Sequence, residues 1–151
     1  MLSETDRRIL KLIQEEGRIT NQELASRCGL SPSSCFERLK RLREQDYILG
    51  FYAQLNPKKL DRSLLIFIEV LMDRTTGDVF KNFAETVSAM PEILECHMVA
   101  GGFDYLIKVR VRDMEAYRAF LADTLVHMPG VRETRTYAVL DELKNVASLP
   151  L

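Results

Sequence analysis

Two helix-start signals separated by a glycine turn constrain this chain more than any other feature. Thr20 and Glu23 have the spacing of a capping box, in which a hydroxyl and a carboxylate satisfy free N–H groups at the start of a helix. Ser31 followed by Pro32 marks a second start, because proline is tolerated at the first helical position. Only the pair Gly29-Leu30 separates the two predicted helices. This pattern predicts a helix-turn-helix motif over about residues 20–43.

Apolar spacing predicts a further helix before this motif. A helix from about Glu4 to Glu16 would be capped by Ser3 and would end at Gly17. In the helix that follows Ser31, apolar residues recur at the i, i+4 and i+7 positions and should face inward: Cys35, Leu39 and Leu42. We therefore expect residues 1–50 to form a helix-turn-helix DNA-binding domain.

The charge distribution agrees with two parts that have different partners. The net charge is −1, which by itself does not point to a nucleic-acid-binding protein. Residues 1–60, however, hold 11 basic and 8 acidic side chains, whereas residues 61–151 hold 10 and 14. The basic excess in the first part favours double-stranded DNA as its partner.

The outer face of the helix after Ser31 carries the candidate DNA contacts. Ser33 and Ser34 are small and could donate to phosphate or to base edges in a major groove. Arg38 is the best candidate for a bidentate contact with guanine, and Glu37 could accept from cytosine or pair with Arg41. The remaining candidates are expected mainly to hold phosphates or the helix start: Gln22, Arg27, Ser31, Lys40 and Arg41. The alternative interpretation is an ordinary solvated charged face.

The rest of the chain predicts a second domain. Residues 51–62 are predicted to be a linker strand that could pair with a partner chain, because they belong to a β-rich stretch that ends at Pro57. Residues 63–140 predict a β-α-β-β-α-β order, and residues 141–151 form a C-terminal tail. The predicted elements are the strand Leu64–Met72, a helix near Asp78–Met90, the strand Ile93–Val99, an alternating strand from Tyr105, a helix from Asp113 to about His127, and the strand Val131–Leu140.

A weak internal repeat supports this order. The pattern Met-Pro-x-[Ile/Val]-x-Glu begins at Met90 and again at Met128, each time where a predicted helix gives way to a strand. Two such β-α-β halves predict a ferredoxin-like fold, with four antiparallel strands and both helices on one face. A chance six-residue match is the alternative. The fold class is therefore α+β.

The turn between the second and third strands of this domain is a candidate site for an amino acid. Gly101 and Gly102 would let a ligand approach the backbone, where adjacent N–H groups can hold a carboxylate. Asp104 offers a carboxylate for an ammonium group. The alternative is a β-turn with an ordinary flanking aspartate, which the residues alone favour slightly.

Other function classes have little support in the sequence. We find no nucleophile–base pair, Walker loop or paired carboxylates, so we expect no enzyme activity and no catalytic residues. His97, His127 and the three cysteines lack the spacing of metal ligands, so we expect neither a metal nor a cofactor. No apolar run reaches the length of a membrane span and the N-terminus lacks the pattern of a signal peptide, so we expect a cytoplasmic location.

Five segments, distributed over nearly the whole chain, carry a further signal: Asp6–Leu10, Gly17–Leu24, Gly29–Arg38, Glu95–Lys108 and Pro129–Tyr137. Together they resemble the Lrp/AsnC (feast/famine) family of transcription regulators. The resemblance implies a winged-type helix-turn-helix followed by an ACT-like effector domain. It also implies homodimers, formed partly through the linker strand and the sheets, that assemble into octamers or similar rings.

The resemblance further implies an amino-acid effector, leucine or another apolar amino acid, bound between subunits. By motif match its site would comprise Met98, Gly101, Gly102, Asp104 and Tyr105, with Tyr137, Ala138 and Val139 linked to the leucine response. We therefore expect a sequence-specific transcription regulator whose activity or assembly responds to an amino acid. The alternative is an amino-acid-binding module that acts through protein contacts.

Overall fold

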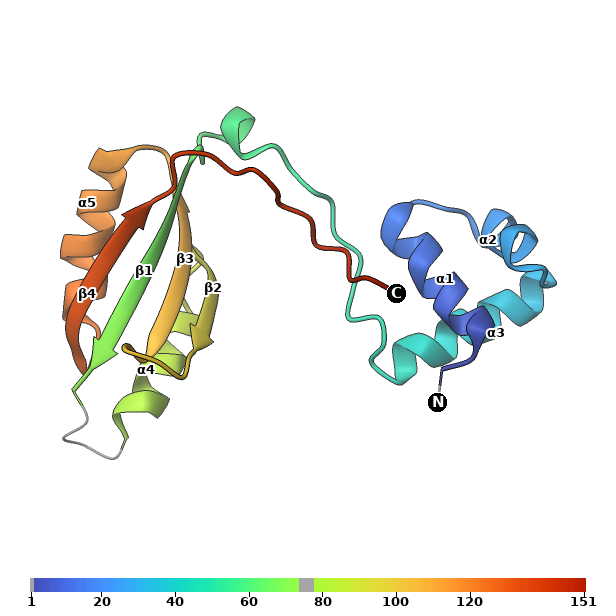
Figure 1. The fold of residues 1–151 in the computed structure, drawn as a ribbon, viewed down its shortest axis with the longest axis horizontal. Helices are drawn as coiled ribbons and strands as arrows, with labels where there is room; N and C mark the ends of the chain where they lie inside the picture. The colour runs from blue at the N-terminus through green and yellow to red at the C-terminus, as the bar shows by residue number, and fades with distance from the viewer. Residues whose placement is uncertain (1, 74–77) are drawn as a thin grey trace. The chain divides into compact units, whose positions relative to one another are not determined.

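The computed structural model describes residues 2–73 and 78–151, which form two compact units. Unit 1 comprises Met1–Gln54 and Lys144–Leu151, and unit 2 comprises Leu55–Leu143 (Figure 1). The C-terminal tail thus divides at Leu143, and its last eight residues belong with the helices of unit 1.

Unit 1 is a three-helix bundle: α1 is Glu4–Glu15, α2 is Asn21–Cys28 and α3 is Pro32–Glu44. The expected caps form at all three N-termini. Ser3 and Asp6 make a complete capping box, whereas at α2 the hydroxyl half of the predicted box forms, with Thr20 accepting from the N–H of Glu23. The core residues are Ile9, Leu10, Leu12, Ile13, Leu24, Ala25, Cys35 and Leu42. Burial of these side chains stabilises the bundle, since each large one contributes about 1.5–3 kcal/mol.

The predicted linker strand has no strand partner within the described part of this chain. Residues 51–56 form no helix or strand there, and Pro57–Leu60 is a 3-10 helix capped by the side chain of Asn56. A strand needs a neighbouring backbone to complete its hydrogen bonds, and none is offered here. The β-rich composition of this segment is therefore compatible with a strand only when another chain supplies that backbone.

Unit 2 has the predicted β-α-β-β-α-β order. Its elements are β1 (Leu64–Met72), α4 (Val79–Ser88), β2 (Ile93–Met98), β3 (Tyr105–Val111), α5 (Met114–Asp123), the 3-10 helix Leu125–His127 and β4 (Val131–Ala138). All pairings are antiparallel and the strand order is β2-β3-β1-β4. This is the order of a ferredoxin-like sheet, in which β2 and β4 are the two edge strands.

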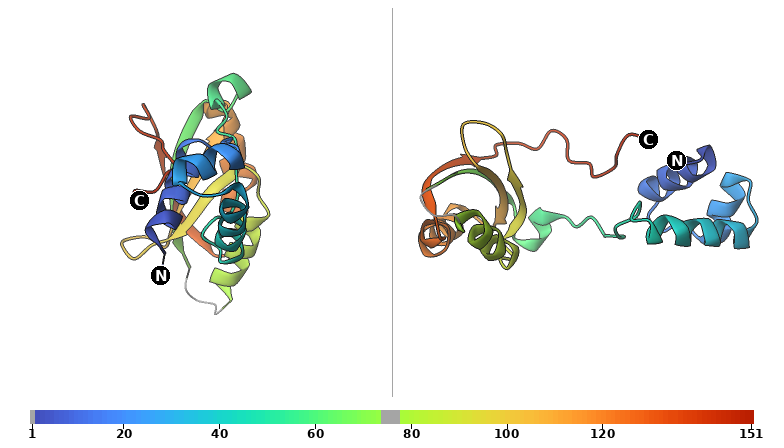
Figure 2. Two further views of the ribbon diagram at one scale, coloured as in Figure 1. Left: turned by 90° about the vertical axis from the view of Figure 1, so that its right-hand side faces the viewer. Right: turned by 90° about the horizontal axis from the view of Figure 1, so that it is seen from below.

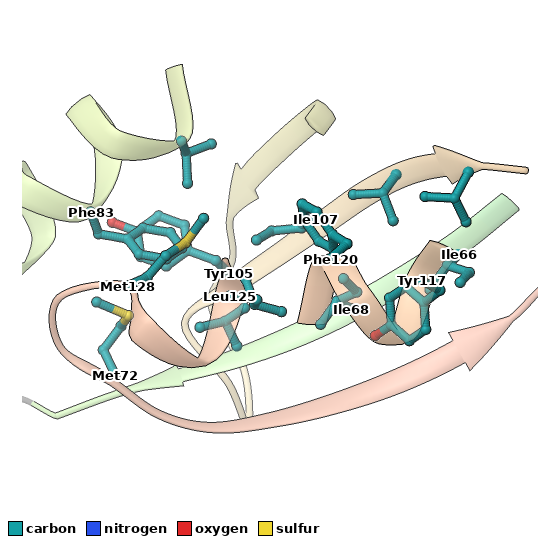
Figure 3. Close-up of a cluster of buried hydrophobic side chains, with 14 of the residues drawn as sticks. Ile66, Ile68, Met72, Phe83, Tyr105, Ile107, Tyr117, Phe120, Leu125 and Met128 are labelled. Atoms are coloured by element: carbon teal, nitrogen blue, oxygen red, sulfur yellow. The ribbon is translucent and has the colours of Figure 1, made fainter. Parts of the chain in front are cut away.

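Both helices of unit 2 cover the same face of the sheet (Figure 2). The strict alternation predicted for β3 is confirmed, because Tyr105, Ile107, Val109 and Val111 are buried while the residues between them are partly exposed. Together with Ile66, Ile68, Val70 and Met72 of β1, these side chains pack against Phe83 of α4 and Tyr117 and Phe120 of α5 (Figure 3).

The helices of unit 2 are shorter than predicted. In α4, the buried positions are Val79, Phe83 and Val87, whereas Ala84 is exposed. Helix α5 ends at Asp123, and a separate 3-10 turn, Leu125–His127, follows it. Leu125 is fully buried, so packing rather than helix periodicity decides where α5 ends.

Candidate functional site

The turn between α2 and α3 has the geometry that the sequence predicts. Gly29 adopts a left-handed conformation with φ of 67°, which residues with a side chain rarely adopt, and the N–H of Leu30 donates to the carbonyl of Ala25 at 2.9 Å. The side-chain amide of Asn21 donates to the carbonyl of Pro32 at 2.8 Å, which joins the start of α2 to the start of α3. The two helix starts are therefore held in a fixed relation.

The N-terminal part of α3 is open to solvent. Ser33, Ser34 and Glu37 are exposed, and none of the three contributes to the core of unit 1. The hydroxyl of Ser31 is occupied by capping, since it accepts from the N–H of Ser34 at 3.2 Å and lies 3.1 Å from the hydroxyl of Ser33. The partial positive charge at the N-terminus of α3 and these small side chains make a surface suited to the negatively charged DNA groove.

The remaining predicted DNA contacts differ in solvent exposure and in whether they already form an ion pair. Gln22, Lys40 and Arg41 are exposed. Arg27 is half-buried and pairs with Glu16, so part of its charge is already neutralised.

The guanidinium groups of Arg38 and Arg41 share one buried carboxylate. Asp6 is 4% exposed and accepts from Arg38 Nη1 at 3.0 Å and from Arg41 Nη2 at 3.1 Å. It also accepts from the hydroxyl of Ser3 at 2.6 Å. Burial by itself would raise the pKa of Asp6, but the hydrogen bonds from Ser3 and Arg38 and the charge of Arg41 hold that pKa below its usual value. Asp6 therefore fixes the orientation of both arginines from α1.

Phe36 is an exposed residue of α3 that sequence reasoning missed. Its side chain is 56% exposed and lines a groove with Leu39, Lys40 and Arg43 of α3 and with Phe51 of the linker. The sequence carried a signal, because Phe36 is an aromatic residue outside the i, i+4, i+7 series that begins at Cys35.

In unit 2 the β2–β3 turn is well ordered by hydrogen bonds. The N–H of Val99 donates to the carbonyl of Asp104 at 3.0 Å, and the N–H of Asp104 donates to the carbonyl of Val70 at 2.9 Å. Gly101 and Gly102 are exposed, and a side-chain carbon added at either would meet no atom within 4 Å. The backbone of these two glycines is therefore open to close approach.

The carboxylate of Asp104 has a structural partner. Asp104 is buried, and its Oδ2 accepts from the N–H of Met72 at 2.8 Å, at the end of β1. This bond ties the turn to the sheet across 32 residues of sequence.

Tyr105 and Met98 face one another across β2 and β3 but differ in burial. Tyr105 is 5% exposed and packs on Phe83 with ring centroids 4.6 Å apart (Figure 3). Met98, by contrast, is 66% exposed. Burial is the main cause that raises the pKa of the Tyr105 hydroxyl, and the nearby Cys96 and Asp104 raise it further. Tyr105 is thus a core residue, and Met98 is the side chain of this pair that a ligand could reach.

The predicted residues on β4 lie apart from this turn within one chain. Tyr137 and Ala138 are exposed, and the N–H of Val139 donates to the carbonyl of Leu65. A hydrogen bond to Glu69 and partial desolvation raise the pKa of Tyr137. Because β2 and β4 are opposite edges of the sheet, β3 and β1 separate the two groups of predicted ligand contacts.

The described residues offer little for other kinds of site. Among them, no three His, Cys, Asp or Glu side chains gather as a metal site. Cys28, Cys35 and Cys96 are free thiols, and burial raises the pKa of each. None of the helices within residues 2–73 and 78–151 has the length and hydrophobicity that a bilayer crossing requires.

Two family models match this chain in the same order as its two units. A model described as winged helix-turn-helix DNA-binding matches residues 2–48, and a model described as Lrp/AsnC ligand binding domain matches residues 65–149.

Similar proteins agree with these matches. The leucine-responsive regulatory proteins of Klebsiella pneumoniae and of Escherichia coli K12 are each 52% identical over 143 residues, covering 95% of this chain and 87% of the relative. A solved structure of a transcriptional regulator from Neisseria meningitidis in complex with L-Met is 39% identical, with a TM-score of 0.94 and coverage of 99% of this chain and 97% of that one. An AsnC family regulator from Agrobacterium tumefaciens is 29% identical, with a TM-score of 0.92 and the same coverage.

Proposed function

The chain belongs to the Lrp/AsnC family of DNA-binding transcription regulators with an amino-acid-binding domain, and we propose that α3 reads DNA while unit 2 binds an apolar amino acid. As a member of this family it is a regulator and not an enzyme. A protein with this role would work in the compartment that holds the DNA.

The observation that carries the DNA-binding part is the exposed N-terminal end of α3, held by the Gly29 turn against α2. We propose that Ser33, Ser34, Glu37 and Arg38 face the major groove, in the manner of a recognition helix. The remaining residues would contact phosphates of the duplex or stabilise the start of a helix: Gln22, Arg27, Ser31, Lys40 and Arg41.

A mobility-shift assay on the DNA upstream of the protein's own gene tests this part. Specific binding should shift that fragment at protein concentrations that leave a scrambled duplex free, and its affinity should fall steeply with salt as counterions are released. Equal affinity for both duplexes would refute sequence-specific binding. Failure to bind either would favour the alternative of a module that acts through protein contacts.

The amino-acid site is proposed at the β2–β3 turn, with β4 of a second copy completing it. Met98, Gly101 and Gly102 are accessible there, whereas Asp104 and Tyr105 are largely occupied within the chain and would shape the site from beneath. The other three candidates, Tyr137, Ala138 and Val139, lie on the far edge of the sheet, so one chain alone does not collect the whole set. A site between copies resolves this separation.

The effector is proposed to be leucine, methionine or another apolar amino acid. The relatives named leucine-responsive and the neighbour solved with L-Met support this class. A thermal-shift screen of the twenty amino acids identifies the ligand, because one that binds only the native state raises its melting temperature.

Glycine variants test where that ligand binds. Gly102→Val should fold normally, since a side chain there meets no neighbouring atom, but should remove the thermal shift by blocking approach to the backbone. Gly17→Val in unit 1 is the matched control and should keep both the normal fold and the thermal shift. An undiminished shift in Gly102→Val would show that the ligand binds elsewhere.

We propose a homodimer that assembles further, to about an octamer, which is the assembly that the family resemblance implies. The linker supports this because it lacks a partner backbone within the described chain. The linker and the residues just before it carry exposed apolar side chains: Tyr47, Leu49, Phe51, Tyr52 and Leu55. Such a row of side chains is unusual on a monomer and suits an interface between copies. Sedimentation velocity measures the assembly, and a monomer at micromolar concentration would refute it.

A further inference from the structure

The C-terminal strap, residues 139–151, is held at two separate anchors. The first anchor lies in unit 2, where the N–H of Val139 donates to the carbonyl of Leu65 at 2.9 Å. Three residues later, Arg110 Nη2 donates to both carboxylate oxygens of Glu142, at 2.7 and 2.6 Å. The side chain of Arg110 is only 11% exposed, so this ion pair is shielded from solvent more than an ordinary surface pair. The strap therefore leaves unit 2 from a fixed point.

The second anchor lies in unit 1, on the exposed side of α1. The N–H of Leu149 donates to Gln14 Oε1 at 2.7 Å, and Gln14 Nε2 donates to the carbonyl of Leu149 at 3.2 Å. One side-chain amide thus satisfies both backbone groups of a single residue, as a neighbouring strand would. These two residues are 135 positions apart, so no local rule of helix or turn geometry produces the contact.

The sequence around Leu149 suits this contact. Pro150 follows it and favours an extended backbone at Leu149, because the proline ring disfavours the helical region for the preceding residue. The N–H and carbonyl of an extended residue project sideways, where an amide side chain can meet both. The conformation needed for docking is therefore partly set before docking occurs, which lowers its entropic cost.

We propose that the surface of α1 around Gln14 is a docking site for this chain's own segment Lys144–Leu151. Docking places this segment within unit 1. The chain holds the segment at a high effective concentration near α1, so two hydrogen bonds suffice to keep it docked.

Trypsin cleavage tests the docking directly. Lys144 is the only lysine or arginine after Arg135, and cleavage there releases the heptapeptide Asn145–Leu151, whose appearance is measured by mass spectrometry. Cleavage at such a site follows the population of the undocked segment. Gln14→Ala should raise the cleavage rate about two- to tenfold, the range expected when a net hydrogen-bond contribution of this size is lost. Leu149→Pro, which removes the N–H donor, should have a similar effect.

Glu15→Ala is the matched control, because it changes the neighbouring exposed residue of α1 and should leave the cleavage rate unchanged. Far-UV circular dichroism establishes that all variants keep their helices. Equal cleavage rates in the wild type, Gln14→Ala and Glu15→Ala would overturn the proposal.

Dilution separates docking within one chain from exchange between copies. The wild-type cleavage rate should stay constant over a hundredfold dilution if the segment docks on its own chain. A rate that rises on dilution would show that the segment comes from a second copy and would also overturn the proposal. Neither measurement requires DNA or an amino acid, so its outcome is independent of the function proposed above.

Discussion

Replacing Asp6 by alanine should destabilise unit 1 far more than its position in the first turn of α1 implies. The carboxylate is buried and joins four partners: the N–H and hydroxyl of Ser3, Arg38 and Arg41. Loss of a capping interaction costs about 1 kcal/mol, and loss of a hydrogen bond to a charged group about 1.5–3 kcal/mol.

The full sum of these terms is not expected, because the arginines can recover water. The side chains of Arg38 and Arg41 are 33% and 49% exposed, so each can turn its guanidinium toward solvent once Asp6 is gone. We therefore expect a loss of about 2–4 kcal/mol, smaller than for a fully buried pair. The matched control is Glu44→Ala, which breaks the exposed Lys40–Glu44 pair and should cost less than about 1 kcal/mol.

Hydrogen exchange measured by mass spectrometry reports this loss unit by unit. Amides of α1 to α3 should lose protection by roughly 30- to 1000-fold in Asp6→Ala, since about 1.4 kcal/mol corresponds to a factor of ten. Amides of β1 to β4 should keep their protection and serve as an internal reference. If protection in α1 to α3 falls no further than in Glu44→Ala, then Asp6 does not join α1 to α3 as the structure indicates.

Four further predictions follow from particular residues. The depressed pKa of Asp6 means that its contribution to stability is present above about pH 3.9, the ordinary value for aspartate, and is lost as the pH falls through the lower folded-state pKa; acid unfolding of Asp6→Asn should lack this component. Arg38→Ala should weaken a specific DNA site by about 1–3 kcal/mol if Arg38 reads a base, whereas an equal loss on all duplexes, measured by fluorescence anisotropy, would identify a phosphate or structural role. Asp104→Ala should lower the stability of unit 2 by about 1–3 kcal/mol in urea unfolding, because the N–H of Met72 loses its buried acceptor, and an unchanged midpoint would contradict that bond. Gly130→Ala should cost more than about 1 kcal/mol in the same assay, since Gly130 has a φ of 78° and a side chain there would collide with Val79; a neutral result would show that the turn can relax.

Features that depend on neighbouring residues could be predicted before folding is considered. The caps at Ser3, Thr20 and Ser31 and the left-handed Gly29 are local, because each is set by side chains within a few positions. The alternation from Tyr105 to Val111 likewise follows from the two-residue period of a strand and identified the buried face of β3 before any contact was known. The same local motifs carry the family resemblance, which predicted a transcription regulator that responds to an amino acid.

The distant partners of these residues depend on the way the chain folds. No residue near Arg38 in the sequence indicates a partner, yet Asp6 orients its guanidinium. The carboxylate of Asp104, which suits an ammonium group, also accepts from the backbone of β1. The strand order separated the β2–β3 turn from Tyr137, although both belong to the same predicted site. Pairings of this kind arise from the way apolar faces pack and polar groups are satisfied across the fold, and no spacing rule along the chain encodes them.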